Sequence, residues 1–176
     1  MADKISVMLT EEEIDARIKE LGAEITKKYE GKELVLICTL KGAVFFACEL
    51  AKRIELPSQM EFIRCESYGN SDTSSGNVKL LLDLDQNIAG KHVLVIEDII
   101  DTGRTLSYLM EHLKTRKPAS IELVALLDKP ERRVIDIKAD YIGFTIPDKF
   151  VVGYGLDYAQ NYRQLPYIGV VEPDNE

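Results

Sequence analysis

The sequence contains no tryptophan, only two histidines and only three cysteines. Cys38, Cys48 and Cys65 are odd in number, lack CxxC spacing and lie within apolar stretches, so we expect buried free thiols in a reducing compartment. His92 begins a predicted strand and His112 lies on a predicted helix, and neither is expected to act in catalysis. Histidine-rich metal sites and disulfide scaffolds are therefore excluded.

Net positive charge is also missing, because 22 Lys and Arg stand against 30 Asp and Glu, giving a net charge of -8. Such a chain lacks the basic field that holds nucleic acid or an anionic membrane, so any anion must be bound by a local site. No apolar run approaches the roughly 18 residues of a membrane span, and the N-terminal stretch MADKISVMLTEEE has no apolar targeting core. We expect a cytoplasmic protein with neither nucleic acid nor membrane as partner.

The patterns that are present alternate between helix and strand. Thr10 and Glu13 form a capping box that predicts a helix over residues 11–29, ending near Gly31. A second helix over residues 42–54 is expected to pack through Phe45, Cys48 and neighbouring residues. Further helical periodicity continues through Leu113 and stops before Pro118; strands are expected at residues 34–38, 61–68, 78–84, 92–98, 121–127, 141–146 and 150–155. The strand-turn-helix-strand spacing predicts one α/β domain, residues 1–176, built on a mostly parallel sheet.

The segment VLVIEDIIDTGRTL, residues 93–106, carries the densest chemistry. Ligands of open α/β sheets lie beyond the carboxyl ends of the strands, which is where Glu97 and Asp98 are expected. Residues 101–105 then form a turn before the next helix, where unpaired N–H groups and hydroxyls suit a phosphate monoester. Alternatively, the first residues of the turn merely cap the helix. Capping leaves the adjacent carboxylates unexplained, since they would repel each other unless a cation or hydroxyls lie between them.

Two common phosphate-binding signatures, GxxxxGK(S/T) and GxGxxG, are absent from the chain. The segment instead resembles the phosphoribosyl-pyrophosphate (PRPP) motif of the type I phosphoribosyltransferases. The wider match narrows the resemblance to the hypoxanthine-guanine phosphoribosyltransferases: LKG at 40–42, SYGNSDTSSGNVK at 67–79, LLDKP at 126–130 and IPDKFVVGYGLDYAQNYRQLPYIG at 146–169. It implies the type I fold, a mostly parallel central sheet flanked by helices, with a small hood formed from terminal segments including about residues 145–176.

The resemblance also implies a reaction. Family members transfer the 5-phosphoribosyl group of PRPP to N9 of hypoxanthine or guanine, giving IMP or GMP and pyrophosphate, with Mg²⁺, in purine salvage. It implies a homodimer or homotetramer whose partners are small molecules. The preference among hypoxanthine, guanine and xanthine stays open, because these bases differ at the purine 2-position, which a backbone carbonyl would read.

The resemblance assigns the PRPP-binding residues as follows. The 5′-phosphate is expected in the turn formed by Asp101, Thr102, Gly103, Arg104 and Thr105. Glu97 and Asp98 are expected to face the ribose hydroxyls and a hydrated magnesium. Asp101 resembles the proposed general base near purine N7, although it could equally orient the base or the loop.

Pyrophosphate is expected to contact Lys41, Gly42 and Arg163, and the resemblance implies a cis peptide between Leu40 and Lys41. Asp157 would hold a second magnesium near the purine. Because pyrophosphate departs with high negative charge, these cations would stabilise its leaving.

For the purine, Phe150 would stack on the ring, the Val151 backbone would face its Watson-Crick edge and Lys129 would donate to O6. Taken singly, Phe150 is more typical of a core residue, Lys129 of a surface charge and Asp157 of a turn. Ser67 and Tyr68 would begin a flexible lid over residues 67–78 that excludes water, the alternative being a solvated hairpin tip.

Two other classes compete with the enzyme interpretation. A PRPP-sensing regulator could keep the same fold and motif, but would be expected to carry a basic surface or an added DNA-binding domain. A phosphohydrolase with an aspartyl nucleophile needs DxD spacing, whereas Asp98 and Asp101 are three residues apart.

Overall fold

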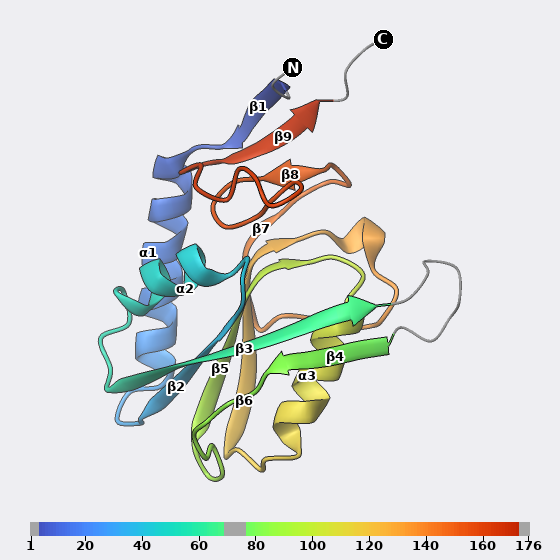
Figure 1. The fold of residues 1–176 in the computed structure, drawn as a ribbon. Helices are drawn as coiled ribbons and strands as arrows, with labels where there is room; N and C mark the ends of the chain where they lie inside the picture. The colour runs from blue at the N-terminus through green and yellow to red at the C-terminus, as the bar shows by residue number, and fades with distance from the viewer. Residues whose placement is uncertain (1–3, 69–76, 173–176) are drawn as a thin grey trace.

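A sheet of parallel strands with one antiparallel edge forms the centre of the computed structural model, which describes residues 4–68 and 77–172 (Figure 1). Its strand order is β4-β3-β2-β5-β6-β7, and only the β3–β4 pair is antiparallel. The strands are β2 (Leu34–Thr39), β3 (Ser58–Tyr68), β4 (Asn77–Leu82), β5 (His92–Ile100), β6 (Ser120–Asp128) and β7 (Tyr141–Thr145). The predicted α/β class is confirmed.

Helices cover both faces of this sheet. α1 (Glu11–Lys28) and α2 (Val44–Ala51) lie on one face and α3 (Arg104–Lys114) on the other (Figure 1). In β5, Leu94 and Ile96 join the apolar cluster beneath α1 and α2, whereas Val93 and Val95 join the cluster beneath α3. The central strands are therefore buried on both faces, as their continuous apolar sequences predict.

The first helix follows its sequence signals closely. The Thr10 Oγ1 atom accepts a hydrogen bond from the Glu13 N–H at 3.2 Å, and Glu13 Oε2 accepts one from the Thr10 N–H at 2.8 Å. This reciprocal capping box satisfies two N–H groups that the first turn leaves unpaired. The helix ends at Lys28, shortly before Gly31 with its φ of +75°.

A second sheet joins the two ends of the chain and forms the hood. Its order is β1-β9-β8, with β1 (Lys4–Leu9) antiparallel to β9 (Ile168–Glu172) and β9 antiparallel to β8 (Val151–Val152). The sheet lies beyond the carboxyl ends of the central strands (Figure 1). A hood of terminal segments was expected, but β1 and β9 were not predicted, because each strand is short and pairs with a segment at the opposite end of the chain.

Several boundaries and one helix face differ from the prediction. β5 continues to Ile100 instead of ending at residue 98, and β3 begins at Ser58. In α2 the buried side chains are Phe46, Ala47 and Leu50.

The expected packing face of α2, through Phe45 and Cys48, was wrong, because both side chains are exposed. An almost wholly apolar short helix carries no periodic signal that would fix its orientation. All three cysteines are free, but only Cys38 is buried, and Cys65 is half-buried. Among the described helices, none is long and apolar enough to cross a membrane.

Candidate active site

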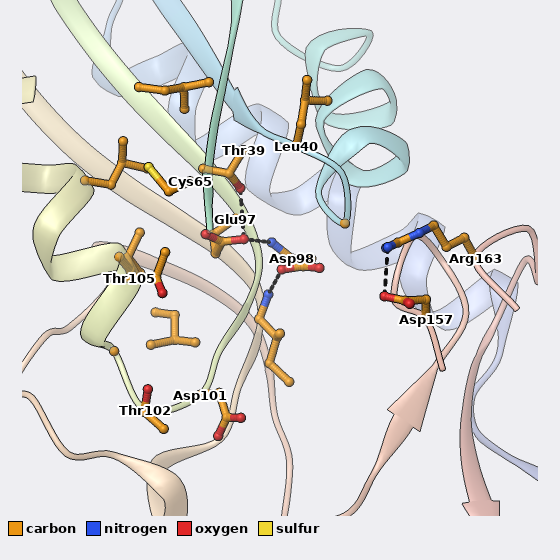
Figure 2. A pocket seen from close by; sticks show the side chains of 17 residues that line it. Thr39, Leu40, Cys65, Glu97, Asp98, Asp101, Thr102, Thr105, Asp157 and Arg163 are labelled. Carbon is orange, nitrogen blue, oxygen red and sulfur yellow. Dashed lines mark hydrogen bonds and ion pairs between the residues drawn. The ribbon is translucent and has the colours of Figure 1, made fainter. Parts of the chain in front are cut away.

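A polar cavity of about 340 Å³ lies at the carboxyl ends of β2 and β5, beside the N-terminus of α3 (Figure 2). Its lining contains nine residues expected in the site: Gly42, Glu97, Asp98, Asp101, Thr102, Gly103, Thr105, Asp157 and Arg163. The topology thus brings residues from three distant segments of the chain to one edge of the sheet, as expected for an open α/β fold.

The floor of this cavity is the carboxylate pair on β5. Glu97 Oε1 accepts hydrogen bonds from Thr39 Oγ1 at 2.9 Å and from the Asp98 N–H at 3.0 Å. Burial of Glu97 and the adjacent charge of Asp98 raise the pKa of Glu97 well above its usual value. A cation or a pair of hydroxyl donors would relieve this repulsion. Thr39 was missed by sequence reasoning, because its role depends on the neighbouring strand.

The turn that follows β5 is not closed by a side-chain cap. Gly103 is the N-cap residue of α3, with φ +84°, and no side chain bonds to the N2 or N3 N–H groups from that position. The Thr102 hydroxyl only approaches the Arg104 N–H, at 3.5 Å. The alternative in which this turn merely caps the helix is therefore wrong. Arg104, expected beside the phosphate, is exposed and does not line the cavity.

The opposite wall comes from the loop after β2 and from the hood. The Leu40-Lys41 peptide is cis, as the resemblance implied. A Cβ atom on Gly155, whose φ is +102°, would stand 1.9 Å from the Gly42 carbonyl oxygen, so the two backbones are in direct contact. This contact places the hood against the loop at residues 40–42.

Arg163 and Asp157 both belong to this wall and form an ion pair, with 2.8 Å between Arg163 Nη2 and Asp157 Oδ1 (Figure 2). Gln160 Oε1 accepts hydrogen bonds from Lys41 Nζ and from Arg163 Nη2, both at 3.3 Å. Gln160 itself has a φ of +67°. No sequence signal identified Gln160, since its position results from an irregular loop.

A second cavity of about 400 Å³ adjoins the first and shares Asp98, Ile99, Asp101 and Asp157 with it. Its other lining residues are Lys129, Arg132, Asp148, Phe150, Val151 and Leu156. The two cavities therefore meet along the end of β5.

Phe150 is 54 % exposed and meets Tyr158 edge-to-face, with ring centroids 5.4 Å apart. Lys129 is only 7 % exposed, and its Nζ donates to the Lys149 carbonyl at 2.9 Å. The alternatives in which Phe150 is a core residue and Lys129 a surface charge are thus both wrong. An exposed ring beside a buried ammonium suits a flat, polar-edged ligand.

The expected lid cannot be placed in the same way. Ser67 is exposed near the end of β3 and Tyr68 is its last residue. Residues 69–76 lie outside the described part of the chain, so the lid over residues 67–78 stays a prediction.

The sequence profile of the phosphoribosyl transferase domain matches residues 8–159. The chain belongs to the phosphoribosyltransferase family. This membership, together with the solved structures described below, confirms the type I fold that the resemblance implied.

Named phosphoribosyltransferases resemble the chain over almost its whole length. It is 54 % identical over 167 residues to the hypoxanthine-guanine phosphoribosyltransferase of Bacillus subtilis, covering 95 % of this chain and 93 % of that protein. The crystal structure of a hypoxanthine phosphoribosyltransferase from Staphylococcus aureus matches with a TM-score of 0.92 and 50 % identity, covering 96 % and 91 %.

A bifunctional relative is much longer. The bifunctional protein TilS/HprT of Listeria monocytogenes is 52 % identical over 168 residues, which is 96 % of this chain and 26 % of that protein. The phosphoribosyltransferase chain thus spans about a quarter of the bifunctional relatives it matches.

Proposed function

We propose that the chain transfers the 5-phosphoribosyl group of PRPP to N9 of hypoxanthine or guanine, giving IMP or GMP and pyrophosphate, in purine salvage. The bond between C1′ and the pyrophosphate oxygen breaks, and the bond between C1′ and N9 forms. The observation that carries this proposal is the wall that the two cavities share at the end of β5, formed by Asp98, Ile99 and Asp101. A phosphate-binding turn opens on one side of it, and an aromatic and lysine pocket on the other.

The first cavity would take PRPP. The N–H groups and hydroxyls of the turn at residues 101–105 would bind the 5′-phosphate, favoured by the positive end of the α3 dipole. Glu97 and Asp98 would accept hydrogen bonds from the ribose 2′- and 3′-hydroxyls. Lys41 and Arg163, which converge on Gln160, would bind the departing pyrophosphate.

Magnesium fits this donor set. Mg²⁺ is commonly held by one or two carboxylates together with substrate oxygens and waters, and the repelling pair Glu97 and Asp98 supplies such carboxylates. In residues 4–68 and 77–172, no group of three or more histidine, cysteine, aspartate or glutamate side chains could hold a metal alone. A bound magnesium would neutralise charge on pyrophosphate as it leaves.

Asp157 is a weaker magnesium ligand in this arrangement. Its Oδ1 atom pairs with Arg163, and its Oδ2 atom accepts from the Gln160 N–H at 2.8 Å. These partners would have to be exchanged before a second magnesium could bind there.

The second cavity would take the purine. Phe150 would stack on the ring, the Val151 backbone would meet its Watson-Crick edge and Lys129 would donate to O6. Lys129 Nζ carries three N–H donors, so it could donate to O6 while it keeps the Lys149 carbonyl as an acceptor. Adenine carries a 6-amino group, which is itself a hydrogen-bond donor, at that position. Its amino group and Lys129 Nζ would therefore be two donors without an acceptor between them.

Asp101 is the proposed general base because it borders both cavities. It would accept the purine proton as N9 attacks C1′, while Arg132 Nε lies 3.3 Å from Asp101 Oδ1. Closure of the predicted lid would exclude water from the oxocarbenium-like transition state.

Nucleotide formation with each base tests the proposed function. Purified protein with magnesium and PRPP is supplied separately with hypoxanthine, guanine, xanthine and adenine, and products are separated by chromatography. We expect IMP and GMP but no AMP. Absence of product with every base would favour the PRPP-sensing regulator, and AMP formation would contradict the role of Lys129.

We also propose a location and an assembly state. A cytoplasmic location is supported by the three unpaired cysteines, which are typical of a reducing compartment. A homodimer or homotetramer is proposed from the family resemblance.

A further inference from the structure

We propose that Arg133 is a positioning residue that holds the phosphate-binding turn in the orientation PRPP needs. The inference rests on the proposed function, because it concerns the PRPP half of the site. Arg133 belongs to residues 129–137, here called the strap, which follow β6 and pass behind the turn at residues 100–103. Arg133 lines neither cavity, so it acts through the turn and not by contact with substrate.

The guanidinium of Arg133 binds the turn from behind. Its Nε donates to the Asp101 carbonyl at 3.1 Å and its Nη2 approaches the Ile100 carbonyl at 3.5 Å. Nη1 donates to the Ile137 carbonyl at 2.5 Å, within the strap itself. Nη2 also pairs with the carboxylate of Asp128. One side chain thus fastens the end of β6, the strap and the turn together.

The strap backbone adds further hydrogen bonds to the same turn. The N–H groups of Val134 and Ile135 donate to the Thr102 carbonyl at 3.0 and 3.1 Å, and the Lys129 N–H donates to the Ile100 carbonyl at 3.0 Å. Three successive carbonyls, those of residues 100, 101 and 102, are therefore all bound by the strap.

The planarity of the peptide unit relates the direction of these carbonyls to the direction of the N–H groups in the turn. In a trans peptide the C=O and N–H bonds of one unit point in opposite directions. Carbonyls held toward the strap therefore turn the N–H groups of Asp101, Thr102 and Gly103 away from it, and all three residues line the first cavity. Converging N–H groups are what an anion-binding turn requires.

The strap and the turn are also in tight contact at Gly103. A Cβ atom on Gly103 would stand 2.7 Å from Ile137 Cγ2 and 3.3 Å from Arg133 Cδ. The turn is thus in van der Waals contact with the strap, and loss of the guanidinium would leave the part-buried carbonyls of Asp101 and Ile137 without their Arg133 donors.

Arginine suits this role better than other residues. The Arg133 side chain is 17 % exposed and its Asp128 partner 14 %, so the charge is partly shielded from solvent together with its counter-ion. The planar guanidinium offers five donors in a fixed fork, whereas lysine offers three from a single atom. Lysine could reach some of these acceptors but not hold all of them at once.

Arg133→Met tests the proposal, with Arg17→Met as the matched control. Arg17 also spans two elements, donating from Nε and Nη2 to the carbonyls of Gly143 and Ile142 at 3.1 and 2.8 Å, and it lines neither cavity. Unfolding temperature without ligands, kcat, and the KM for PRPP and for hypoxanthine are measured for both. Calorimetry with PRPP and magnesium measures binding without turnover.

We expect Arg133→Met to raise the PRPP KM and Kd roughly 10- to 100-fold, with smaller changes in kcat and in the hypoxanthine KM. Arg17→Met should lower the unfolding temperature without changing the PRPP KM. Arg133→Lys should lie between the wild type and Arg133→Met. If Arg133→Met does not fold, Arg133→Lys and Asp128→Asn give the same comparison.

A PRPP KM and Kd that match those of the Arg17 control would overturn the proposal. A wild-type protein that binds PRPP without forming nucleotide would instead contradict the proposed function. In that case the calorimetric comparison would still test Arg133.

Discussion

Gly42 and Asp98 lie so close together that a Cβ atom on Gly42 would stand 1.7 Å from Asp98 Oδ2. The missing side chain at position 42 is therefore what makes room for the Asp98 carboxylate beneath the loop that follows β2. The backbone of Gly42 does not have a positive φ, so an alanine here would be opposed by this contact with Asp98 and not by backbone conformation.

Gly42→Ala should act by displacing Asp98. Because the carboxylate is the far end of a side chain and can rotate, we expect little loss of folding stability but a fall in kcat/KM for PRPP of roughly 100-fold. Asp98→Ala should give a similar fall. The double variant should be no slower than either single variant, since all three remove the same carboxylate from its place. Multiplicative losses in the steady-state kinetics would show that Gly42 acts independently.

Asp101→Asn should separate binding from chemistry. The amide keeps the shape of the turn but cannot take the purine proton, so we expect kcat to fall roughly 10²- to 10⁴-fold with the PRPP Kd nearly unchanged. Asp136→Asn, an exposed carboxylate of the strap outside both cavities, is the control. An unchanged kcat would reduce Asp101 to a residue that shapes the loop.

Lys129→Met should weaken purine binding selectively. A hydrogen bond to a charged group contributes about 1.5–3 kcal/mol, so the KM for hypoxanthine should rise roughly 10- to 100-fold while the PRPP KM changes little. The control is Lys149→Met, whose exposed side chain lines neither cavity. Equal effects of the two substitutions on the hypoxanthine KM would argue against a contact between Lys129 and O6.

Acid should weaken the fold through Glu122 on β6, far from both cavities. Burial opposes ionisation of Glu122, but hydrogen bonds from Lys28, Tyr29 and Tyr141 outweigh it and hold its pKa below the ordinary 4.5. A carboxyl with a lowered folded-state pKa stabilises the fold above its unfolded-state pKa and loses that contribution as the pH falls through the folded value.

The free energy of unfolding of wild type and Glu122→Gln should therefore differ by about 1–3 kcal/mol at pH 7. The difference should shrink as the pH falls below 4.5, as measured by urea denaturation between pH 3.5 and 7. Glu111→Gln, which removes an exposed carboxylate on α3, is the control. A difference that does not vary with pH would mean that the charge of Glu122 is unimportant.

The parts of the site that the sequence predicts are those built within one short segment. Residues 97–105 form strand, turn and helix in succession, so their relative placement follows from local rules. Thr39, Gln160 and Arg133 could not be found in this way, because their partners lie on other strands and loops. The sequence also could not decide whether Asp101 and Thr102 cap the helix, since only the structure shows that Gly103 occupies the N-cap position.

The fold was predictable to a similar extent. The central strands have continuous apolar sequences and were placed within a few residues, whereas the apolar composition of α2 left its buried face undetermined. β1 and β9 stabilise each other across the full length of the chain, a pairing that no local pattern of either strand reveals.

The pairing of β1 with β9 supports the second cavity from outside, although neither strand lines it. Lys4 lies opposite Glu172 and Ile5 opposite Val171, while β9 in turn holds Val151 opposite Val170. Phe150 and Val151, which line the second cavity, are therefore supported through β9 by the N-terminal strand. Loss of β1 or of β9 would therefore loosen this cavity wall, although both strands lie outside the two cavities.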